Sequence, residues 1–240
     1  MNLTGKTIII TGAKRIGQEV GKVLAQKGAN LVVVYNSSSK EAEDLVKEVK
    51  DYGVKAIALQ ADLSNQDDIK RIVNQAISEL GSIEGLVHMA APYPKTPLGE
   101  ITMQDVDKIM TSIAGSSILL GQEVGLKMNE GKIIFFSDWS VFRAPYKDYL
   151  VYNAAKGAVE SITKTLALAL APKVSVNAIA PGPILPPPDL TDEENKEALA
   201  RTPLNAWGGA DEIAKAVLYL FESDFTTGVV LPVDGGRSIA

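Results

Sequence analysis

The 240-residue sequence contains no cysteine and only one histidine, His88. The absence of cysteine excludes disulfides, thiolate metal sites and cysteine nucleophiles. One histidine is too few for a multi-histidine zinc site, and it leaves a Ser-His-Asp mechanism a single candidate base. Most hydrolase and zinc-enzyme functions are therefore disfavoured, and no metal site is expected. A chain without thiols is also compatible with a reducing cytoplasm.

The sequence also lacks long apolar runs and an excess of positive charge. No stretch reaches the ~18 apolar residues of a membrane span, and residues 1–6 are too short and polar for a signal peptide. We therefore expect a cytoplasmic protein without a membrane partner. Lysine and arginine number 24 against 29 acids, a net charge of −5, so no broad positive field would attract nucleic acid. The expected partner is a small-molecule substrate, and any anion must be bound locally.

What is present is an alternation of apolar runs with amphipathic helical patterns from end to end, without repeats or a linker. This alternation is typical of a parallel sheet covered by helices. It predicts an α/β, doubly wound fold in one domain over residues 1–240, with a seven-stranded parallel sheet. The strands are expected near residues 7–10, 31–35, 54–59, 86–90, 133–136, 174–180 and 229–233. A long helical region is expected at 103–128, and Ser38 with Glu41 has the spacing of a helix capping box.

Prolines interrupt one segment of this pattern. They occur at positions 181, 183, 186, 187 and 188, and they exclude a continuous helix at the start of the segment 181–206. Long irregular segments in compact domains often cover functional sites. We expect residues 183–206 to form a substrate lid; the alternative is a surface loop without a role.

The turn after the first strand reads Thr-Gly-Ala-Lys-Arg-Ile-Gly at residues 11–17. Glycine allows a close backbone approach there, and the start of the following helix offers unpaired amides to a phosphate. Two glycines match the usual three-glycine dinucleotide fingerprint only weakly, so a simple tight turn is the alternative.

The end of the second strand decides the expected cofactor. An acid at this place would bond the 2′-hydroxyl of a ribose and repel a 2′-phosphate. Residues 35–38 read Tyr-Asn-Ser-Ser, and the first carboxylate is Glu41. Lys14, Arg15 and the two serine hydroxyls form a plausible 2′-phosphate pocket. NADP(H) is therefore the expected cofactor; the alternative is that both cations are solvated turn residues and cofactor choice is loose.

Tyr152 and Lys156 are four residues apart at the start of a predicted helix, so their side chains share one face. A nearby ammonium favours the phenolate and lowers the pKa of a tyrosine, which can then exchange a proton with a carbonyl or alcohol oxygen near neutral pH. Taken alone, the Tyr-x-x-x-Lys spacing does not establish catalysis; the alternative is an ordinary pair of exposed side chains on a helix.

Further segments accompany this pair: Asp-Leu-Ser at 62–64, Val-Asn-Ala-Ile-Ala-Pro-Gly at 176–182 and Val-Asp-Gly-Gly at 233–236. With the glycine turn and Tyr-Asn-Ala-Ala-Lys at 152–156, they cover nearly the whole chain in order. The sequence therefore resembles the short-chain dehydrogenase/reductase family. The resemblance implies a Rossmann domain, an oxidoreductase activity, and a homo-oligomer (tetramer or dimer) in which helices 103–128 and 152–170 pack between subunits.

The sequence departs from the family pattern at several places. The middle glycine of the family's Thr-Gly-x-x-x-Gly-x-Gly turn is missing, and the Lys-Arg pair resembles that of pteridine reductases. The family's Asn-Asn-Ala-Gly becomes His-Met-Ala-Ala at 88–91, so His88 is expected to be a structural substitute for asparagine. The family's helix asparagine is replaced by Ser112 or Ile113, depending on register. Ser112 or a backbone carbonyl would then hold the relay water.

The position of the family's catalytic serine, after the fifth strand, falls on Asp138. This substitution resembles pteridine reductases, in which aspartate, tyrosine and lysine form the catalytic set. A carboxylic acid beside the tyrosine either donates a hydrogen bond when protonated or orients a protonated substrate nitrogen when ionised. Ser137 and Ser140 remain candidates for the position, and a turn cap is the alternative role of Asp138.

These observations together predict an NADPH-dependent reductase that transfers hydride to a carbonyl or C=N group of a small molecule, with a pteridine as one candidate. Alternatives are a ketone, sugar or 3-oxoacyl reductase or an alcohol dehydrogenase of the same family, and a non-catalytic dinucleotide-binding sensor. Aromatic residues that could stack on a planar substrate are Trp139, Phe142, Tyr146, Tyr149 and Trp207. The expected catalytic residues are Asp138, Tyr152 and Lys156. The expected cofactor-binding residues are Gly12, Lys14, Arg15, Ile16, Asn36, Ser37, Ser38, Asp62, Leu63, Ala90, Tyr152, Lys156, Pro181, Gly182 and Ile184.

Overall fold

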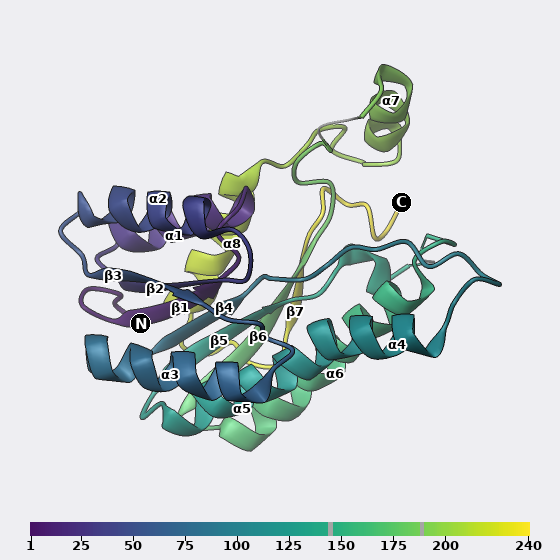
Figure 1. Ribbon diagram of the computed structural model, residues 1–240. Helices are drawn as coiled ribbons and strands as arrows, with labels where there is room; N and C mark the ends of the chain where they lie inside the picture. The colour runs from purple at the N-terminus through teal and green to yellow at the C-terminus, as the bar shows by residue number, and fades with distance from the viewer. Residues whose placement is uncertain (144–145, 188–189) are drawn as a thin grey trace.

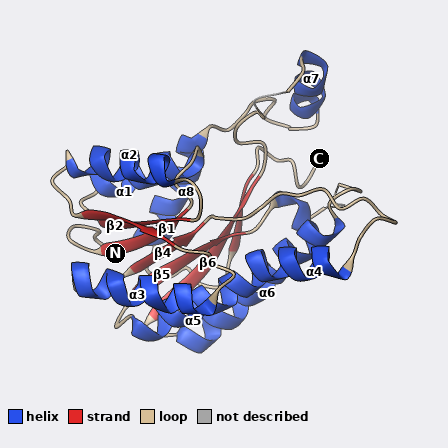
Figure 2. Ribbon diagram, viewed as in Figure 1, coloured by secondary structure: helices blue, strands red, loops and turns tan. Residues whose placement is uncertain are grey.

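A parallel seven-stranded sheet forms the centre of the computed structural model, which describes residues 1–143, 146–187 and 190–240. The strand order is β3-β2-β1-β4-β5-β6-β7 (Figure 2). In chain order the strands are β1 (Thr7–Thr11), β2 (Asn30–Tyr35), β3 (Ala56–Gln60), β4 (Gly85–His88), β5 (Gly131–Phe136), β6 (Val174–Pro181) and β7 (Val230–Val233). The predicted doubly wound α/β fold is confirmed.

Helices cover both faces of the sheet (Figure 1). Buried side chains of one face pack against α1 (Ile16–Gln26), α2 (Ser39–Lys50) and α8 (Ala210–Glu222). Those of the other face pack against α3 (Gln66–Leu80), α5 (Ser116–Lys127) and α6 (Leu150–Leu170). Within the described ranges, every helix is too short or too polar to cross a membrane.

The order of the strands reverses beside β1. The chain first moves outward through β2 and β3, and then returns to place β4 on the other side of β1, where Thr11 is in register with His88. In doubly wound sheets such a reversal opens a crevice at the carboxyl ends of the strands. The glycine turn, the segment after β4 and the start of the lid all leave the sheet at this edge.

One local prediction needs refinement and another needs correction. The expected long helical region 103–128 is present, with one detail that the sequence did not predict: it consists of α4 (Met103–Met110), a π-helical turn (Thr111–Gly115) and α5. The capping box at Ser38 is wrong: Ser38 is the N-cap of α2, but its side chain makes no capping hydrogen bond among the described residues. The carboxylate of Glu41 instead lies 3.1 Å from Lys14 Nζ, where it forms an ion pair with the glycine turn.

The segment 183–206 contains an unpredicted helix, α7 (Asp192–Ala200), which projects away from the sheet (Figure 1). Thr191 Oγ1 accepts from the Glu194 amide, and the Glu194 carboxylate accepts from the Thr191 amide, so a capping box begins this helix. None of its nine residues, all of them described, is buried. Pro188 lies outside the described residues, as does position 189.

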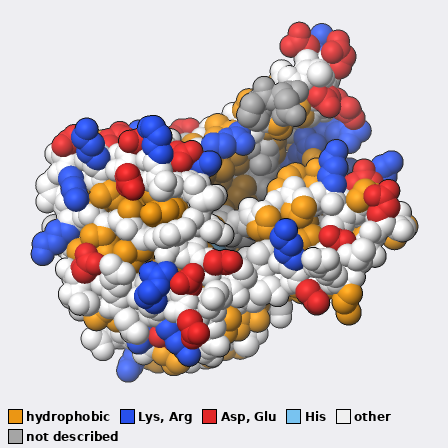
Figure 3. Space-filling view, viewed as in Figure 1, with side chains coloured by type: hydrophobic (Ala, Val, Ile, Leu, Met, Phe, Trp, Pro, Cys, Tyr) orange, Lys and Arg blue, Asp and Glu red, His pale blue; other side chains and the backbone are white. Residues whose placement is uncertain are grey.

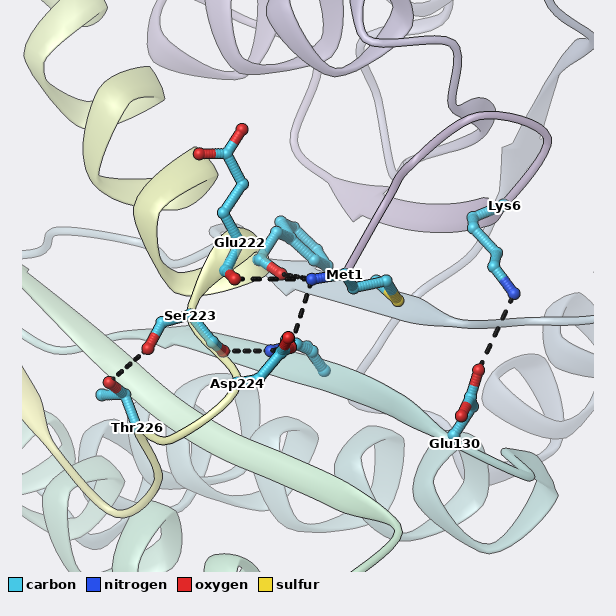
Figure 4. Close-up of polar contacts among 9 residues, drawn as sticks. Met1, Lys6, Glu130, Glu222, Ser223, Asp224 and Thr226 are labelled. Atoms are coloured by element: carbon cyan, nitrogen blue, oxygen red, sulfur yellow. Dashed lines mark hydrogen bonds and ion pairs between the residues drawn. The ribbon is translucent and has the colours of Figure 1, made fainter.

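Ion pairs close the opposite edge of the sheet, at the amino ends of the strands (Figure 4). Lys132 on β5 is buried, and its Nζ donates to Asp224 Oδ1 over 2.9 Å and to the carbonyl of Ser223. The amino group of Met1 lies 3.2 Å from the same carboxylate oxygen. Because Lys132 and the amino group of Met1 are both paired with Asp224, we assign these contacts a structural role. A ligand is therefore expected at the carboxyl edge of the sheet.

Candidate active site

A cleft of about 1520 Å³ opens at the carboxyl edge of the sheet. It is the hollow below α7 in the space-filling view, with Lys and Arg side chains on both sides (Figure 3). The glycine turn, the ends of β2, β4, β5 and β6, and the first residues of the lid line it. All the cofactor-binding residues expected from the sequence line this cleft except Lys156, which lies behind its wall.

The glycine turn is compact enough to need both of its glycines. Gly12 has a φ of +91°, which favours glycine, and it faces the backbone of Ala90. A Cβ on Gly17 would lie 1.9 Å from the carbonyl oxygen of Gly12. The start of α1 therefore comes close to the turn. The Gly17 amide donates to the carbonyl of Lys14, and the next amides of the first helical turn offer a site for an anion.

The two cations of the turn already have partners. Lys14 pairs with Glu41, and Arg15 Nη2 donates to the carbonyl of Pro186 over 2.9 Å. The second contact joins the glycine turn to the lid. Both side chains nevertheless line the cleft beside residues 36–38, so a phosphate there would compete with one carboxylate and one carbonyl.

Asp138 and Tyr152 meet at the end of β5. The hydroxyl of Tyr152 donates to Asp138 Oδ2 over 2.9 Å, and Asp138 Oδ1 accepts from the Ser140 amide over 2.9 Å. Asp138 thus caps the short 3-10 helix Trp139–Val141 and also contacts the tyrosine. The turn-cap role and the tyrosine contact, treated as alternatives from the sequence, are both present.

The two serines considered for this position face elsewhere. Ser137 is buried, and its hydroxyl donates to the backbone carbonyl of Lys156 over 3.2 Å. The hydroxyl of Ser140 donates to Asn153 Oδ1 over 2.9 Å. The structure therefore places Asp138 against Tyr152 in preference to either serine.

The electrostatics of this pair contradict one expectation. Tyr152 is buried, and this burial together with the Asp138 carboxylate raises the pKa of its hydroxyl. We expected Lys156 to lower that pKa. Lys156 Nζ instead donates to the carbonyl of Phe136 over 2.7 Å and lies 5.7 Å from the centre of the Tyr152 ring. Burial lowers the pKa of Lys156 to about 8 and outweighs the opposing effect of the Asp138 charge there, whereas at Tyr152 burial and Asp138 act in the same direction.

His88 is enclosed in a chain of hydrogen bonds. Thr11 Oγ1 accepts from the amides of residues 89–90 and lies 2.8 Å from His88 Nδ1, so the threonine proton points to the ring. The ring then donates through Nε2 to Ser116 Oγ over 3.0 Å, and Ser116 donates to the carbonyl of Ser112 over 2.8 Å. Burial, with the charge of Lys156, lowers the pKa of His88 to about 3. The ring is neutral, as its expected structural role requires.

The π-helical turn separates the two candidates for the missing asparagine. Ser112 lines the cleft, and its hydroxyl donates to the carbonyl of Ile109 over 3.1 Å. Ile113 is buried in the core. Ser112 therefore holds the position on the cleft side.

Aromatic rings form the outer part of the cleft. Trp139, Tyr146 and Trp207 line it as expected, whereas Phe142 and Tyr149 do not. The ring that sequence reasoning missed is Tyr93, which stacks on Tyr149 at 4.3 Å and meets Tyr152 edge-on at 4.6 Å. Its position five residues after β4, on the loop leaving the carboxyl edge, could have identified it.

Arg237 was also missed. It is buried, donates to the hydroxyl of Tyr146 over 3.1 Å, and holds its guanidinium 5.2 Å from the Trp139 ring. Another of its nitrogens donates to the carbonyl of Ala198 at the end of α7, over 2.6 Å. Arg237 follows the last strand, and in a parallel sheet this position is again the carboxyl edge.

Comparisons with known proteins agree with this geometry. Residues 12–238 match a family model described as enoyl-(acyl carrier protein) reductase. "Short chain dehydrogenase mdpC" of Emericella nidulans is 31% identical, over 98% of this chain and 96% of the relative.

Solved structures match over almost the full chain. A blue fluorescent protein from a metagenomic library, in complex with NADPH, has a TM-score of 0.92 and 31% identity over 99% of both chains. FolM alternative dihydrofolate reductase 1 from Brucella canis, complexed with NADP, has a TM-score of 0.92 and 29% identity, covering 100% of this chain and 97% of its own.

Proposed function

Because this chain belongs to the short-chain dehydrogenase/reductase family, we propose that it reduces a carbonyl or C=N group of a small planar molecule, with a dihydropteridine as the favoured class. NADP(H) is the cofactor, since similar structures hold NADPH or NADP. The contact that carries the proposal is the hydrogen bond from Tyr152 to Asp138.

The cleft fits a dinucleotide phosphorylated on its ribose. The tight turn at Gly12 lines the cleft, as do Lys14 and Arg15 together with Ser37 and Ser38. Among the described lining residues near the end of β2, none is a carboxylate that would repel a 2′-phosphate. When bound, the nicotinamide supplies hydride. Residues at its other end would be Pro181, Gly182 and Ile184.

Tyr152 is suited to donate a proton. Its raised pKa keeps the hydroxyl protonated through the neutral range, which favours reduction over alcohol oxidation, because oxidation needs a phenolate base. As the proton leaves, negative charge develops on the phenolate oxygen. The ammonium of Lys156, fixed by the carbonyl of Phe136, stabilises that charge.

The free acceptor sites of Asp138 indicate which class of substrate would bind beside it. Each of its carboxylate oxygens accepts one hydrogen bond in this structure and retains a second lone pair. A nitrogen heterocycle offers N–H groups to such acceptors, whereas a simple ketone offers none. Tyr93 and Trp139 are aromatic residues that line the same cleft, which supports a planar substrate. Residues 183–185 and 187 line the cleft from the lid and would close over it.

The test is NADPH oxidation with a panel containing a dihydropteridine, an aromatic ketone, a 3-oxoacyl thioester and a sugar. The dihydropteridine should give the highest kcat/KM, and Tyr152→Phe should lower kcat/KM by about 10²-fold or more. Tyr219→Phe, on the exposed part of α8, is the matched control and should leave the rate unchanged. Near-normal turnover by Tyr152→Phe would show that another group supplies the proton. NADPH binding without oxidation across the panel would favour the non-catalytic sensor.

We also propose that two or four copies assemble through α5 and α6. Leu126 on α5 and Leu168 on α6 are exposed by 73% and 83%, and exposed leucines on neighbouring helices favour burial against a second copy. Leu168→Glu should shift the mass measured by light scattering toward the monomer; an unchanged mass would place the interface elsewhere.

A further inference from the structure

A second cavity, of about 530 Å³, lies beside the cleft and is rich in cations. We call it the basic hollow. Its positively charged lining residues are Arg143, Lys147, Arg201 and Arg237. Within the described parts of the chain, no acidic side chain lines it, and the negative group among its lining residues is the terminal carboxylate of Ala240. Such a concentration of positive charge contrasts with the net charge of −5 for the whole sequence.

The basic hollow and the cleft share a wall. Trp139, Tyr146 and Arg237 line both cavities. Arg237 is only 6% exposed and is held in this wall by the hydroxyl of Tyr146 and the face of Trp139. A ring seated beside Asp138 would therefore have Trp139 next to it, and a substituent on that ring would have to extend around this shared wall to reach the basic hollow.

The charges of the basic hollow are largely uncompensated. In the described residues, Arg143, Lys147 and Arg237 form no ion pair with a carboxylate; only Arg201 does, with Glu197. Elsewhere on the surface, lysines such as Lys22 and Lys164 have acidic partners. A buried guanidinium bonded only to neutral oxygens gains from an anion that reaches it.

We propose that the basic hollow binds an anionic tail, carboxylate or phosphate, of the substrate whose ring lies in the cleft. The inference rests on the proposed reductase function and narrows its substrate to a ring with a negatively charged extension. Arg143 and Lys147 would contact the tail directly, and Arg237 would link tail and ring. Planar guanidinium groups bind both carboxylate and phosphate with paired hydrogen bonds.

Substrates with and without a tail test this directly. Dihydrofolate carries two carboxylates on its tail, a dihydroneopterin phosphate carries a phosphate ester, and dihydrobiopterin carries neither. The double variant Arg143→Gln/Lys147→Gln should lower kcat/KM for a tailed substrate relative to dihydrobiopterin by about tenfold. The substrate showing the larger loss identifies the carboxylate or the phosphate as the preferred anion. Equal ratios in variant and wild type would overturn the proposal.

The matched control is Lys55→Gln/Lys70→Gln, which removes the same two charges from exposed positions away from both cavities. This control should leave the ratio unchanged. If it lowered the ratio as much as the test variant, the effect would come from total charge, and the proposal would fail.

A binding measurement separates this proposal from the reductase proposal. In a Trp207→Phe background Trp139 is the sole tryptophan, and its fluorescence reports on the shared wall. Titration with p-aminobenzoylglutamate, which has the tail but no reducible ring, should saturate and should weaken about tenfold in the double variant. If no pteridine is reduced but this binding persists, the reductase proposal fails alone; if the double variant binds the probe as the wild type does, the basic hollow is not an anion site.

Discussion

The hydroxyl of Tyr152 donates a 2.9 Å hydrogen bond to the carboxylate of Asp138, 14 residues earlier in the chain. The bond joins the start of α6 to the turn after β5, so the two elements fix the site together. Because the acceptor is charged, it stabilises the protonated phenol and raises its pKa, in the same direction as burial. The acidity of Tyr152 therefore depends on the charge of Asp138.

Asp138→Asn should change the pH profile of reduction. The Asp138 charge raises the pKa values of both Tyr152 and Lys156. Removing it should lower both, so the alkaline limb of kcat/KM should move to lower pH by roughly one unit or more. The control Asp51→Asn removes the same charge from the exposed end of α2 and should not move the limb. An unmoved limb in Asp138→Asn would show that the charge of Asp138 does not control the proton donor.

Lys156→Met should inactivate the protein and stabilise it. Burial lowers the pKa of Lys156 from its ordinary 10.5 to about 8, which at neutral pH corresponds to a cost of about 3 kcal/mol. Between these two pKa values the unfolded chain binds the extra proton, so wild-type stability rises with pH through this window. The free energy of unfolding, measured in urea, should be higher for the variant near neutral pH, and the difference should shrink as pH increases.

The exposed Lys164 on α6 gives the control for that measurement. Its ion pair with Glu160 lies on the helix surface, so Lys164→Met should change the free energy of unfolding by less than about 0.5 kcal/mol, with little dependence on pH. A Lys156→Met variant less stable than the wild type at neutral pH would contradict the expected desolvation cost. In that case the hydrogen bond from Lys156 to the carbonyl of Phe136 would stabilise the folded state by more than the burial of the ammonium destabilises it.

The sequence predicted the sheet well because its strands are continuous apolar runs buried on both faces. Ile8, Ile9 and Ile10 on β1 are fully buried, and only a central parallel strand accepts three such residues in succession. Helix α7 was missed because its residues are mostly charged and none is buried. The sequence feature that indicates this helix is the capping-box pair Thr191 and Glu194. A search for apolar periodicity does not detect such a pair.

The site was predicted in its residues better than in its electrostatics. Asp138, Tyr152 and Lys156 come together as expected, but spacing along a helix cannot say which partner fixes Lys156 Nζ. The carbonyl of Phe136 does so, and this contact depends on how β5 lies against α6. Tyr93 and Arg237 follow β4 and β7 in the sequence, which places them at the carboxyl edge of the sheet, but their contacts with Tyr152 and Trp139 depend on the tertiary fold.

Lys14→Gln and Arg15→Gln should change cofactor preference. If these cations bind a 2′-phosphate, the Kd of NADPH should rise by about tenfold in each variant, while the Kd of NADH, which lacks that phosphate, changes little. Arg15→Gln also breaks the contact with Pro186, so it should additionally increase protease cleavage within the lid. Calorimetric titration with both nucleotides measures the preference; a parallel loss of both affinities would assign the cations to turn structure.

His88 should not titrate in the neutral range. As the sole histidine, it gives one set of ring signals in NMR, and these should stay constant through neutral pH because burial lowers the pKa of the ring to about 3. The unfolded ring has an ordinary pKa near 6.5, so the stability contributed by the neutral ring is complete above that value and is lost as pH falls toward 3. Ser116→Ala leaves the Nε2 proton buried without its acceptor and should cost about 1–3 kcal/mol, whereas Ser64→Ala, on the exposed segment after β3, should cost less. A ring that titrates near 6.5 in the folded protein would contradict the enclosed chain from Thr11 to Ser112, and water would then reach the junction between the glycine turn and the π-helical turn.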